Sequence, residues 1–250
     1  MNKFDMNKMD IDPVLQQASI NYGSQSKSDS RVFSVLMRNV YTWMTLALVI
    51  TAFTALYMTK NLALMTSIFE SSFGVWGLFI AQIVVVMILS GRIHKMSFMT
   101  AGCLFALYSI LTGVTISSIF MVFTASSIAS TFFITAGTFG AMSAFGYVTK
   151  KDLTGMGKFL MMALIGLIIA SVVNIFMHSS MLMWITSFVG VLLFVGLTAY
   201  DTQKIKQMLM VHGTDLSDGP MKLALLGSLT LYLDFINLFL YLLQFMGRRE

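Results

Sequence analysis

The chain has 250 residues, of which 57% are hydrophobic and only 11% are charged, with a formal net charge of +5. Soluble domains carry charge at about 25% of positions, so this composition excludes a soluble globular domain and indicates an integral membrane protein. The excess of basic residues suits contact with anionic lipid headgroups, and nothing in their pattern indicates a nucleic-acid site.

The first 30 residues are polar, with Asn, Gln, Ser, Asp and Lys scattered among them. They contain no apolar core followed by a small-residue cleavage site, so we expect no cleaved signal peptide. We interpret residues 1–30 as a disordered cytoplasmic tail and residues 31–250 as one transmembrane domain, because no linker or change of composition divides the rest of the chain.

Long uncharged stretches follow the tail, the longest being the 53 residues from Ser97 to Thr149. A crossing helix needs about 20 apolar residues, so this stretch accommodates two. Counting in this way predicts seven spans, over residues 38–58, 73–91, 98–120, 125–148, 157–177, 182–203 and 221–246. Transmembrane strands would need alternating segments of about 10 residues, whereas these runs are continuously apolar. The expected fold is therefore an all-α bundle of seven transmembrane helices.

The third span contains a cysteine, and the fourth contains regularly spaced glycine and alanine residues. The third holds Cys103, the only cysteine, so no internal disulfide can form. The fourth places Gly137 before Ala141 and Gly140 before Ala144, at the spacing that lets helix backbones approach closely in lipid. Close packing against another helix is the interpretation that we favour, and lining of a water-filled cavity is the alternative.

The basic residues determine the expected orientation. A cytoplasmic N-terminus puts 13 of the 16 Lys and Arg residues on the cytoplasmic side, in agreement with the positive-inside rule. Seven full crossings then put the C-terminus, with Arg248 and Arg249, outside. A last helix that dips into the membrane and returns would put the C-terminus inside; we favour seven crossings.

Two carboxylates lie in or at the end of apolar spans. Asp201 is at the cytoplasmic end of the sixth span, and Asp234 is in the middle of the seventh. A carboxylate at the bilayer centre costs about 2.5 to 3.5 kcal/mol on insertion scales, so Asp234 must be neutralised, paired or used. Helical periodicity places it on one stripe with Thr230, Asn237 and Tyr241. We expect this polar stripe to point into the bundle.

If the two carboxyl groups meet, both cannot ionise cheaply, and they titrate as a unit that shares one proton. The shared proton would tie the sixth span to the seventh, and its loss would drive the carboxylates apart and attract a cation. The alternatives are structural. Asp234 could be protonated and only hydrogen-bond a neighbouring helix, and Asp201 could be a solvated cap or the ion-pair partner of Lys204.

The segments "GLTAYDTQKIK" (196–206) and "LTLYLDFINLFLYLL" (229–243) resemble the signature segments of the Bax inhibitor family, the transmembrane Bax inhibitor motif proteins, in its bacterial branch. The resemblance covers about residues 30–247 and implies a seven-helix bundle of the bacterial inner (cell) membrane. The last helix would be central and wrapped by the other six.

The resemblance also implies a function. It is that of a pH-sensitive calcium leak channel, in which Asp201 and Asp234 form the pH sensor and gate. Arg92, at the cytoplasmic end of the second span, would be a latch on that pair, with an interfacial anchor as its alternative role. Some bacterial relatives carry an acidic residue within the second span, where this chain has Gln82.

The candidate lining of the ion pathway consists of Thr230, Asn237 and Tyr241. Calcium normally takes roughly six to eight oxygen ligands, and two aspartates with a few neutral oxygens fall short of that. Weak coordination suits an ion that must leave again. We therefore expect transient calcium at Asp201 and Asp234, no tightly bound cofactor, and leak conduction.

Two other functions are the alternatives. Intramembrane aspartyl proteases also use two aspartates, but their second aspartate lies in a Gly-x-Gly-Asp segment, whereas Leu231, Tyr232 and Leu233 precede Asp234. We therefore expect no enzyme. The other alternative is a non-conducting regulator that binds a membrane protease or a protein of the stress or cell-death response. Its fold would be the same, and ion flux through liposomes distinguishes it from a channel.

Overall fold

A computed structural model describes residues 13–212 and 215–248, in which every regular element is a helix. Two short 3-10 turns, η1 (Ile93–Lys95) and η2 (Ser118–Met121), follow the third and fourth of the α-helices. The α-helices in chain order are α1 (Pro13–Lys60), α2 (Leu62–Phe69), α3 (Ser72–Arg92), α4 (Phe98–Ser117), α5 (Ala125–Val148), α6 (Thr154–Met177), α7 (Ser180–His212) and α8 (Asp218–Met246).

Seven helical segments of the described residues are long and apolar enough to cross a membrane, which confirms the predicted fold class. Five of them agree with the predicted spans to within four residues at each end. The first begins earlier, at Arg31, and the sixth ends later, at His212. Hydropathy ends a span at its first charges, whereas a helix continues beyond the lipid through residues of good helix propensity such as Lys204 and Gln207. The short helix α2 was not predicted, because eight residues give too little periodicity to detect.

The N-terminal part of the chain differs from the expectation. Helix α1 begins at Pro13, so the backbone is helical over residues 13–30, where the sequence predicted disorder. Proline suits the first turn of a helix, and extending an existing helix avoids the cost of a new nucleus. Residues 1–12 lie outside the described residues. The division into a tail and a transmembrane domain stays a prediction.

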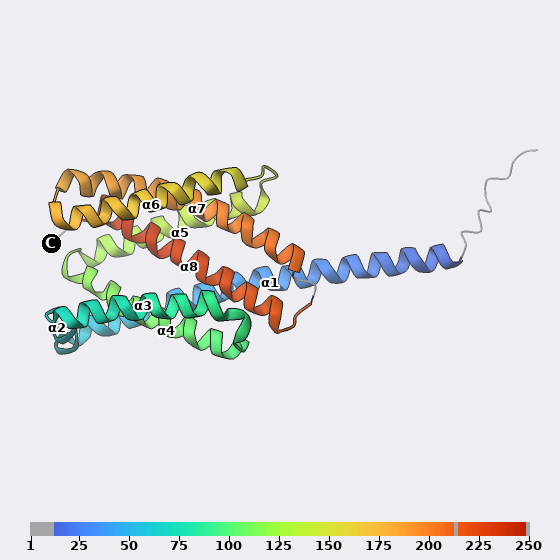
Figure 1. The fold of residues 1–250 in the computed structure, drawn as a ribbon, viewed down its shortest axis with the longest axis horizontal. Coiled ribbons are helices and arrows are strands. Elements are labelled where there is room, and N and C mark those ends of the chain that lie inside the picture. The colour runs from blue at the N-terminus through green and yellow to red at the C-terminus, as the bar shows by residue number, and fades with distance from the viewer. Residues whose placement is uncertain (1–12, 213–214, 249–250) are drawn as a thin grey trace, which may run out of the picture.

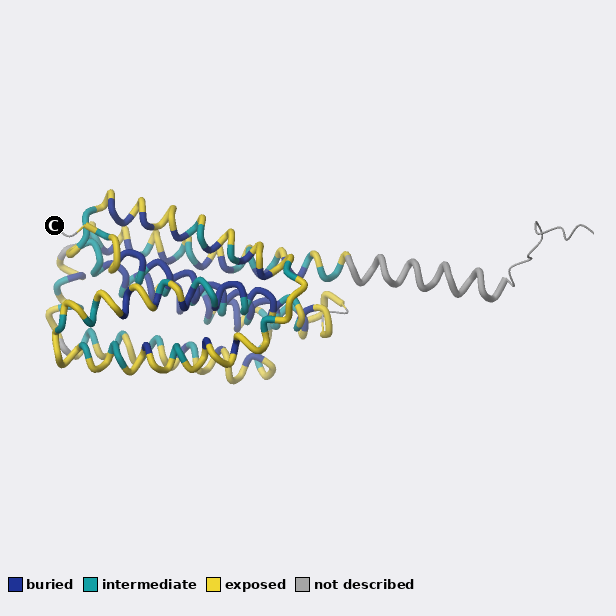
Figure 2. Tube along the Cα trace, turned by 90° about the horizontal axis from the view of Figure 1, so that it is seen from above, coloured by how far each residue is buried: buried dark blue, intermediate teal, exposed yellow. Residues whose placement is uncertain are grey.

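Helix α8 lies at the centre of the bundle. In its crossing segment 67% of residues are buried, compared with 11% in those of α3 and α6. Figure 2 shows the same contrast, with buried backbone concentrated in the middle of the bundle and exposed residues around it. The sequence accounts for this position, because α8 interrupts its apolar residues with polar ones that need protein partners.

The other crossing helices flank α8 in two groups, as Figure 1 shows. Helices α1, α3 and α4 form one group, and α5, α6 and α7 form the other. Within each group the first and third helices pack together and the second covers the third. Helix α8 packs mainly against α1, α4, α5 and α7, so α3 and α6 form an outer layer. Helix α8 is therefore central, as expected, but four of the other six crossing helices surround it directly and two lie outside these.

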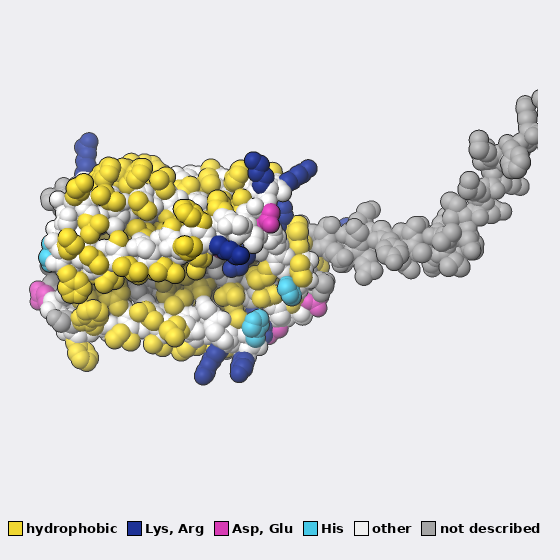
Figure 3. All heavy atoms as spheres, turned by 45° about the horizontal axis from the view of Figure 1, so that its top comes forward, with side chains coloured by type: hydrophobic (Ala, Val, Ile, Leu, Met, Phe, Trp, Pro, Cys, Tyr) yellow, Lys and Arg dark blue, Asp and Glu magenta, His cyan; other side chains and the backbone are white. Residues whose placement is uncertain are grey.

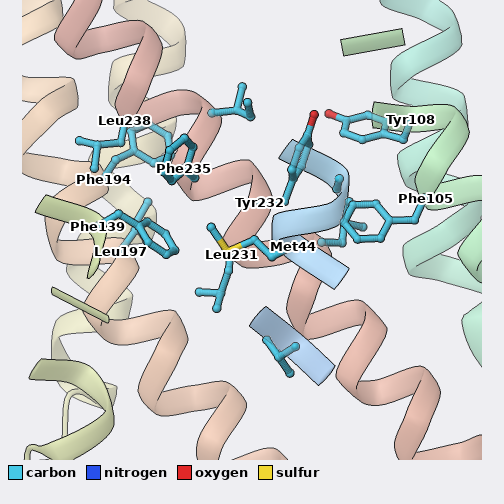
Figure 4. Close-up of a cluster of buried hydrophobic side chains, with 14 of the residues drawn as sticks. Met44, Phe105, Tyr108, Phe139, Phe194, Leu197, Leu231, Tyr232, Phe235 and Leu238 are labelled. Atoms are coloured by element: carbon cyan, nitrogen blue, oxygen red, sulfur yellow. The ribbon is translucent and has the colours of Figure 1, made fainter. Parts of the chain in front are cut away.

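Aromatic and aliphatic side chains fill the space around α8. Figure 4 shows Leu231, Tyr232 and Phe235 of α8 among residues from both groups. The rings of Phe105 and Tyr232 pack edge to face with their centres 5.6 Å apart, and those of Phe139 and Phe235 do so at 5.4 Å. The central helix therefore joins the two groups through one continuous core.

The small residues of α5 serve close packing at a different place from the one predicted. A Cβ atom at Gly146 would collide with the Ala199 carbonyl group of α7, so the two backbones touch there. By contrast, a Cβ atom at Gly137 or Gly140 would meet no atom within 4 Å. The predicted packing role of the pairs that begin at these two glycines is wrong, because residue spacing identifies a small face but not the face that meets a neighbour.

The last helix crosses the whole bundle. Helix α8 is continuous from Asp218 to Met246, and Figure 1 shows its C-terminal end opposite the end from which α1 extends. The backbone of Arg248 is fixed there by hydrogen bonds to Thr124 and Ser127 at the start of α5. A re-entrant last helix is therefore excluded. Figure 3 shows Lys and Arg side chains gathered mostly at the end from which α1 extends, with hydrophobic side chains along the flank.

Candidate functional site

The polar stripe of α8 faces α7. A Cβ atom at Gly227 would lie 3.0 Å from Ile205 of α7, and one at Gly190 of α7 would lie 2.6 Å from the ring of Tyr241. The Tyr241 ring also stacks on Phe194 of α7, with ring centres 5.7 Å apart. These contacts fix an antiparallel register and place Tyr241 against α7. The inward direction of Thr230 and Asn237, which are half-buried, stays a prediction.

Asp201 and Asp234 meet in the middle of this register. Asp234 is 5% exposed, Asp201 is half-buried, and their side chains are within hydrogen-bonding reach of one another. Among the buried side-chain oxygens and nitrogens of the described residues, the one without a hydrogen-bond partner is Oδ2 of Asp234. Two ionised carboxylates would both be acceptors, so this contact requires a proton to be favourable.

The charged residues around the pair are few. Lys204, one turn along α7, is the cation whose field acts on the Asp201 carboxyl group. In the described part of the chain the one salt bridge joins Lys222 to Asp218, at 3.9 Å, and involves neither Asp201 nor Asp234. Arg92 is exposed at the C-terminal end of α3. The structure does not bring Arg92 to the pair, and its latch role stays a prediction.

Two of the predicted lining residues, Thr230 and Asn237, donate hydrogen bonds within α8. The Thr230 hydroxyl group donates to the Leu226 carbonyl oxygen at 3.2 Å. The Asn237 amide donates to the Leu233 carbonyl oxygen at 2.8 Å. Both side chains and Tyr241 are half-buried, and their lining role stays a prediction. No group of three or more His, Cys, Asp or Glu side chains suited to a metal ion occurs in the described ranges.

Residues 34–250 match the family model described as "Inhibitor of apoptosis-promoting Bax1". The chain belongs to the Bax inhibitor family. It is 53% identical over 214 residues to the inner membrane protein YbhL of Escherichia coli K12, an alignment that covers 86% of this chain and 92% of YbhL. Uncharacterized proteins of Borreliella burgdorferi and Rickettsia prowazekii are 45% and 43% identical, each over 91% of this chain and 97% and 95% of their own lengths.

In the family segment around Asp201, three successive polar side chains have partners in different elements. The Thr202 hydroxyl group lies 3.1 Å from that of Ser143 in α5. Gln203 accepts from the Leu153 N–H and donates to the Lys151 carbonyl oxygen, each at 2.8 Å, and so holds the loop between α5 and α6. Because three successive residues contact three different elements, the height and rotation of α7 in the bundle are fixed, and with them the position of the Asp201 side chain. Apart from the polarity of the segment, no feature of the sequence indicated these partners.

Two hydroxyl chains of this Bax inhibitor family member were missed by sequence reasoning. In the first, the Tyr41 hydroxyl group of α1 lies 2.7 Å from that of Ser143, which continues to Thr202. In the second, the Thr51 hydroxyl group lies 2.7 Å from that of Tyr232 and donates to a carbonyl oxygen of α4 at 3.0 Å. Figure 4 shows the hydroxyl ends of Tyr108 and Tyr232 pointing toward one another. The abundance of Ser and Thr in these spans was the available signal.

Gln82 has a structural role in α3. Its amide donates to the Leu111 carbonyl oxygen at 3.0 Å and to the Thr115 hydroxyl group at 2.5 Å, both in α4. A half-buried amide that bonds a neighbouring helix helps to hold the two helices together in lipid. In this family member, position 82 thus joins α3 to α4.

Proposed function

We propose that this Bax inhibitor family protein is a pH-sensitive cation leak channel of the bacterial inner membrane. Asp201 and Asp234 share a proton and form its gate. The proposal is supported above all by Asp234, whose carboxyl group lies beside that of Asp201 and whose buried Oδ2 atom has no hydrogen-bond partner among the described residues. The location agrees with the name of the E. coli relative, an inner membrane protein. The proposed activity is transport, with calcium as the expected cation, and includes no catalysis.

The closed state holds the shared proton. One carboxyl group donates to the other, so the pair carries one negative charge and ties α7 to α8 at their buried seam. Lys204 lies close enough to offset part of that charge. A single, partly compensated charge is tolerable at this depth, whereas two would carry the full desolvation penalty.

The open state follows loss of the proton. Two unit charges at about 4 Å repel by about 4 kcal/mol at an effective dielectric constant of 20. That energy changes an equilibrium constant by roughly a thousandfold. The change is enough to make an open arrangement of α7 and α8 the populated state, although it is a minor state while the proton is bound. The separated carboxylates would then attract a cation, and their weak coordination would let it pass. Flux is therefore expected to rise with pH.

The variant Asp234→Asn tests the gate. An amide cannot share an ionisable proton with Asp201, so calcium flux into liposomes should lose its dependence on pH between 5 and 8 while the protein still folds. The matched control is Asp218→Asn, which removes an exposed carboxylate at the start of the same helix and should leave the pH dependence as in the wild type. An unchanged pH response in Asp234→Asn would remove the sensor role from the pair.

A non-conducting regulator of a membrane protease or of the stress or cell-death response is the second candidate. The family model's description as an apoptosis inhibitor favours it. Purified protein that passes no calcium, potassium or protons at any pH in liposomes would support the regulator and contradict the channel.

A further inference from the structure

A cleft of about 650 Å³ lies between α1 and α5 and has no assigned occupant. Its side walls come from the two helices, and Phe235 of α8 contributes to its lining from the centre of the bundle. The hydroxyl contact between Tyr41 and Ser143 joins the two walls. The cleft is distinct from the seam between α7 and α8, because neither aspartate lines it.

The α5 wall of the cleft is shaped to receive a chain. It includes Gly140 and Ala144, which are exposed. A Cβ atom at Gly140 would meet nothing within 4 Å, so none of the helices described by the structure covers it. Lipid-facing helices normally contact acyl chains, and a recess without protein atoms leaves its lining without van der Waals partners unless a lipid fills it.

One end of the cleft is positively charged. Arg38 is the single charged residue among those that line it, and no carboxylate does. The ion pair of the described residues joins Lys222 and Asp218, so Arg38 has no acidic partner in that part of the chain. On the opposite wall Tyr147 also lines the cleft, and the Lys206 ammonium group lies 5.0 Å from the centre of its ring. Lys206 of α7 thus adds a second cation beside the α5 wall, at the end of the cleft that holds Arg38 of α1.

The depth of the cleft matches one leaflet. Ten residues of α1 separate Arg38 from Leu48, which corresponds to about 15 Å of helix and to half of the roughly 30 Å hydrocarbon core. Leu48, Phe132 and Phe235 at the deep end of the cleft also line a second, almost wholly apolar pocket of about 350 Å³. The charged end therefore lies at headgroup level and the apolar floor at acyl-chain depth.

We propose that this cleft binds an anionic phospholipid, with its phosphate on the Arg38 guanidinium group and one acyl chain lying over Gly140 toward Leu48. Charge decides between the occupants that fit an apolar recess. Basic pockets between transmembrane helices select anionic headgroups, whereas a second copy of the chain would bring its own basic residues to the same end. The proposal is independent of whether the protein conducts ions.

Native mass spectrometry of the full chain, purified in detergent and titrated with dioleoyl phosphatidylglycerol or dioleoyl phosphatidylcholine, tests the headgroup contact. The wild type should retain phosphatidylglycerol in preference. The variant Arg38→Gln should bind it about fivefold more weakly, the effect expected of one basic residue. Arg31→Gln, which removes an exposed arginine of the same helix outside the cleft lining, should bind as the wild type does.

The acyl-chain contact needs its own pair of variants. Gly140→Leu should fill the recess and reduce phosphatidylglycerol retention without lowering the unfolding temperature. Gly137→Leu is the matched control, since it also meets open space but lies outside the cleft lining, and should retain the lipid. Equal binding of the two lipids, unchanged binding by Arg38→Gln, or a dimer that crosslinks across the cleft would each overturn the proposal.

Discussion

Asp234 combines deep burial with an ionisable group, and the residues around it explain how the chain tolerates both. Thr202 holds α7 against α5, and Gln203 holds it against the loop that follows α5. The Asp201 carboxyl group therefore stays beside Asp234 without an ion pair. The surrounding hydroxyl and amide groups are satisfied, which leaves the acidic pair as the place where protonation changes the interactions. Residue-scale tests should therefore alter the charge near the pair and keep its geometry.

Lys204 offers such a test. Its positive charge stabilises the ionised form of Asp201, so it favours loss of the shared proton. Lys204→Gln removes that stabilisation, and the proton should then stay bound to a higher pH. We expect the midpoint of the flux curve to move up by about half a pH unit in liposome assays. Lys206→Gln, whose ammonium group instead contacts the Tyr147 carbonyl oxygen, should shift it less; a downward shift for Lys204→Gln would contradict the gate.

At the scale of elements, helices α5 and α7 are held together by backbone contact. Gly146→Ala places a methyl group against the Ala199 carbonyl group, so the helices must separate. Overpacking of this kind costs about 1 to 3 kcal/mol. Gly137→Ala adds the same methyl group in open space and should be neutral or stabilising by up to about 1 kcal/mol, from helix propensity. Unfolding of the purified protein in mixed micelles measures both, and equal stability of the two variants would refute the close approach.

The contact of α1 with α8 depends on a buried hydroxyl pair. Tyr232→Phe removes the hydroxyl group that meets Thr51 of α1. It keeps the aromatic ring of α8 that packs on Phe105 of α4. Hydrogen bonds within membranes contribute about 0.6 kcal/mol on average, so a loss of that size is expected in the same unfolding assay. Tyr57→Phe, at a ring that is 61% exposed, should leave stability unchanged. A larger loss for the exposed ring would argue against the hydroxyl pair.

For the whole molecule, the sequence predicted the features that follow from the hydropathy of each segment, and it did not predict those that depend on which helices pack together. Continuous apolar runs predict the seven spans, because lipid accepts helices of that length and little else. The stripe predicts the burial of Asp234, whereas Thr230, Asn237 and Tyr241 of the same stripe are only half-buried. The outer positions of α3 and α6, the open face at Gly140 and the separation of Arg92 from the pair were not predicted, because they depend on which helices become neighbours. A single sequence carries hydropathy for every residue but no pairing between spans.

The orientation of the whole molecule decides which compartment the proposed sensor monitors. The charges predict a cytoplasmic N-terminus, and a continuous α8 then requires an outside C-terminus. Alkaline phosphatase fused after Arg248 should be active and green fluorescent protein fused there should be dark. Fusions after Lys151, which follows the fourth span, should show the reverse. Asp201 lies 11 residues before the end of α7 at His212, about 16 Å along the helix. The pair would therefore exchange protons with the cytoplasm, and the opposite fusion pattern would assign it to the other side.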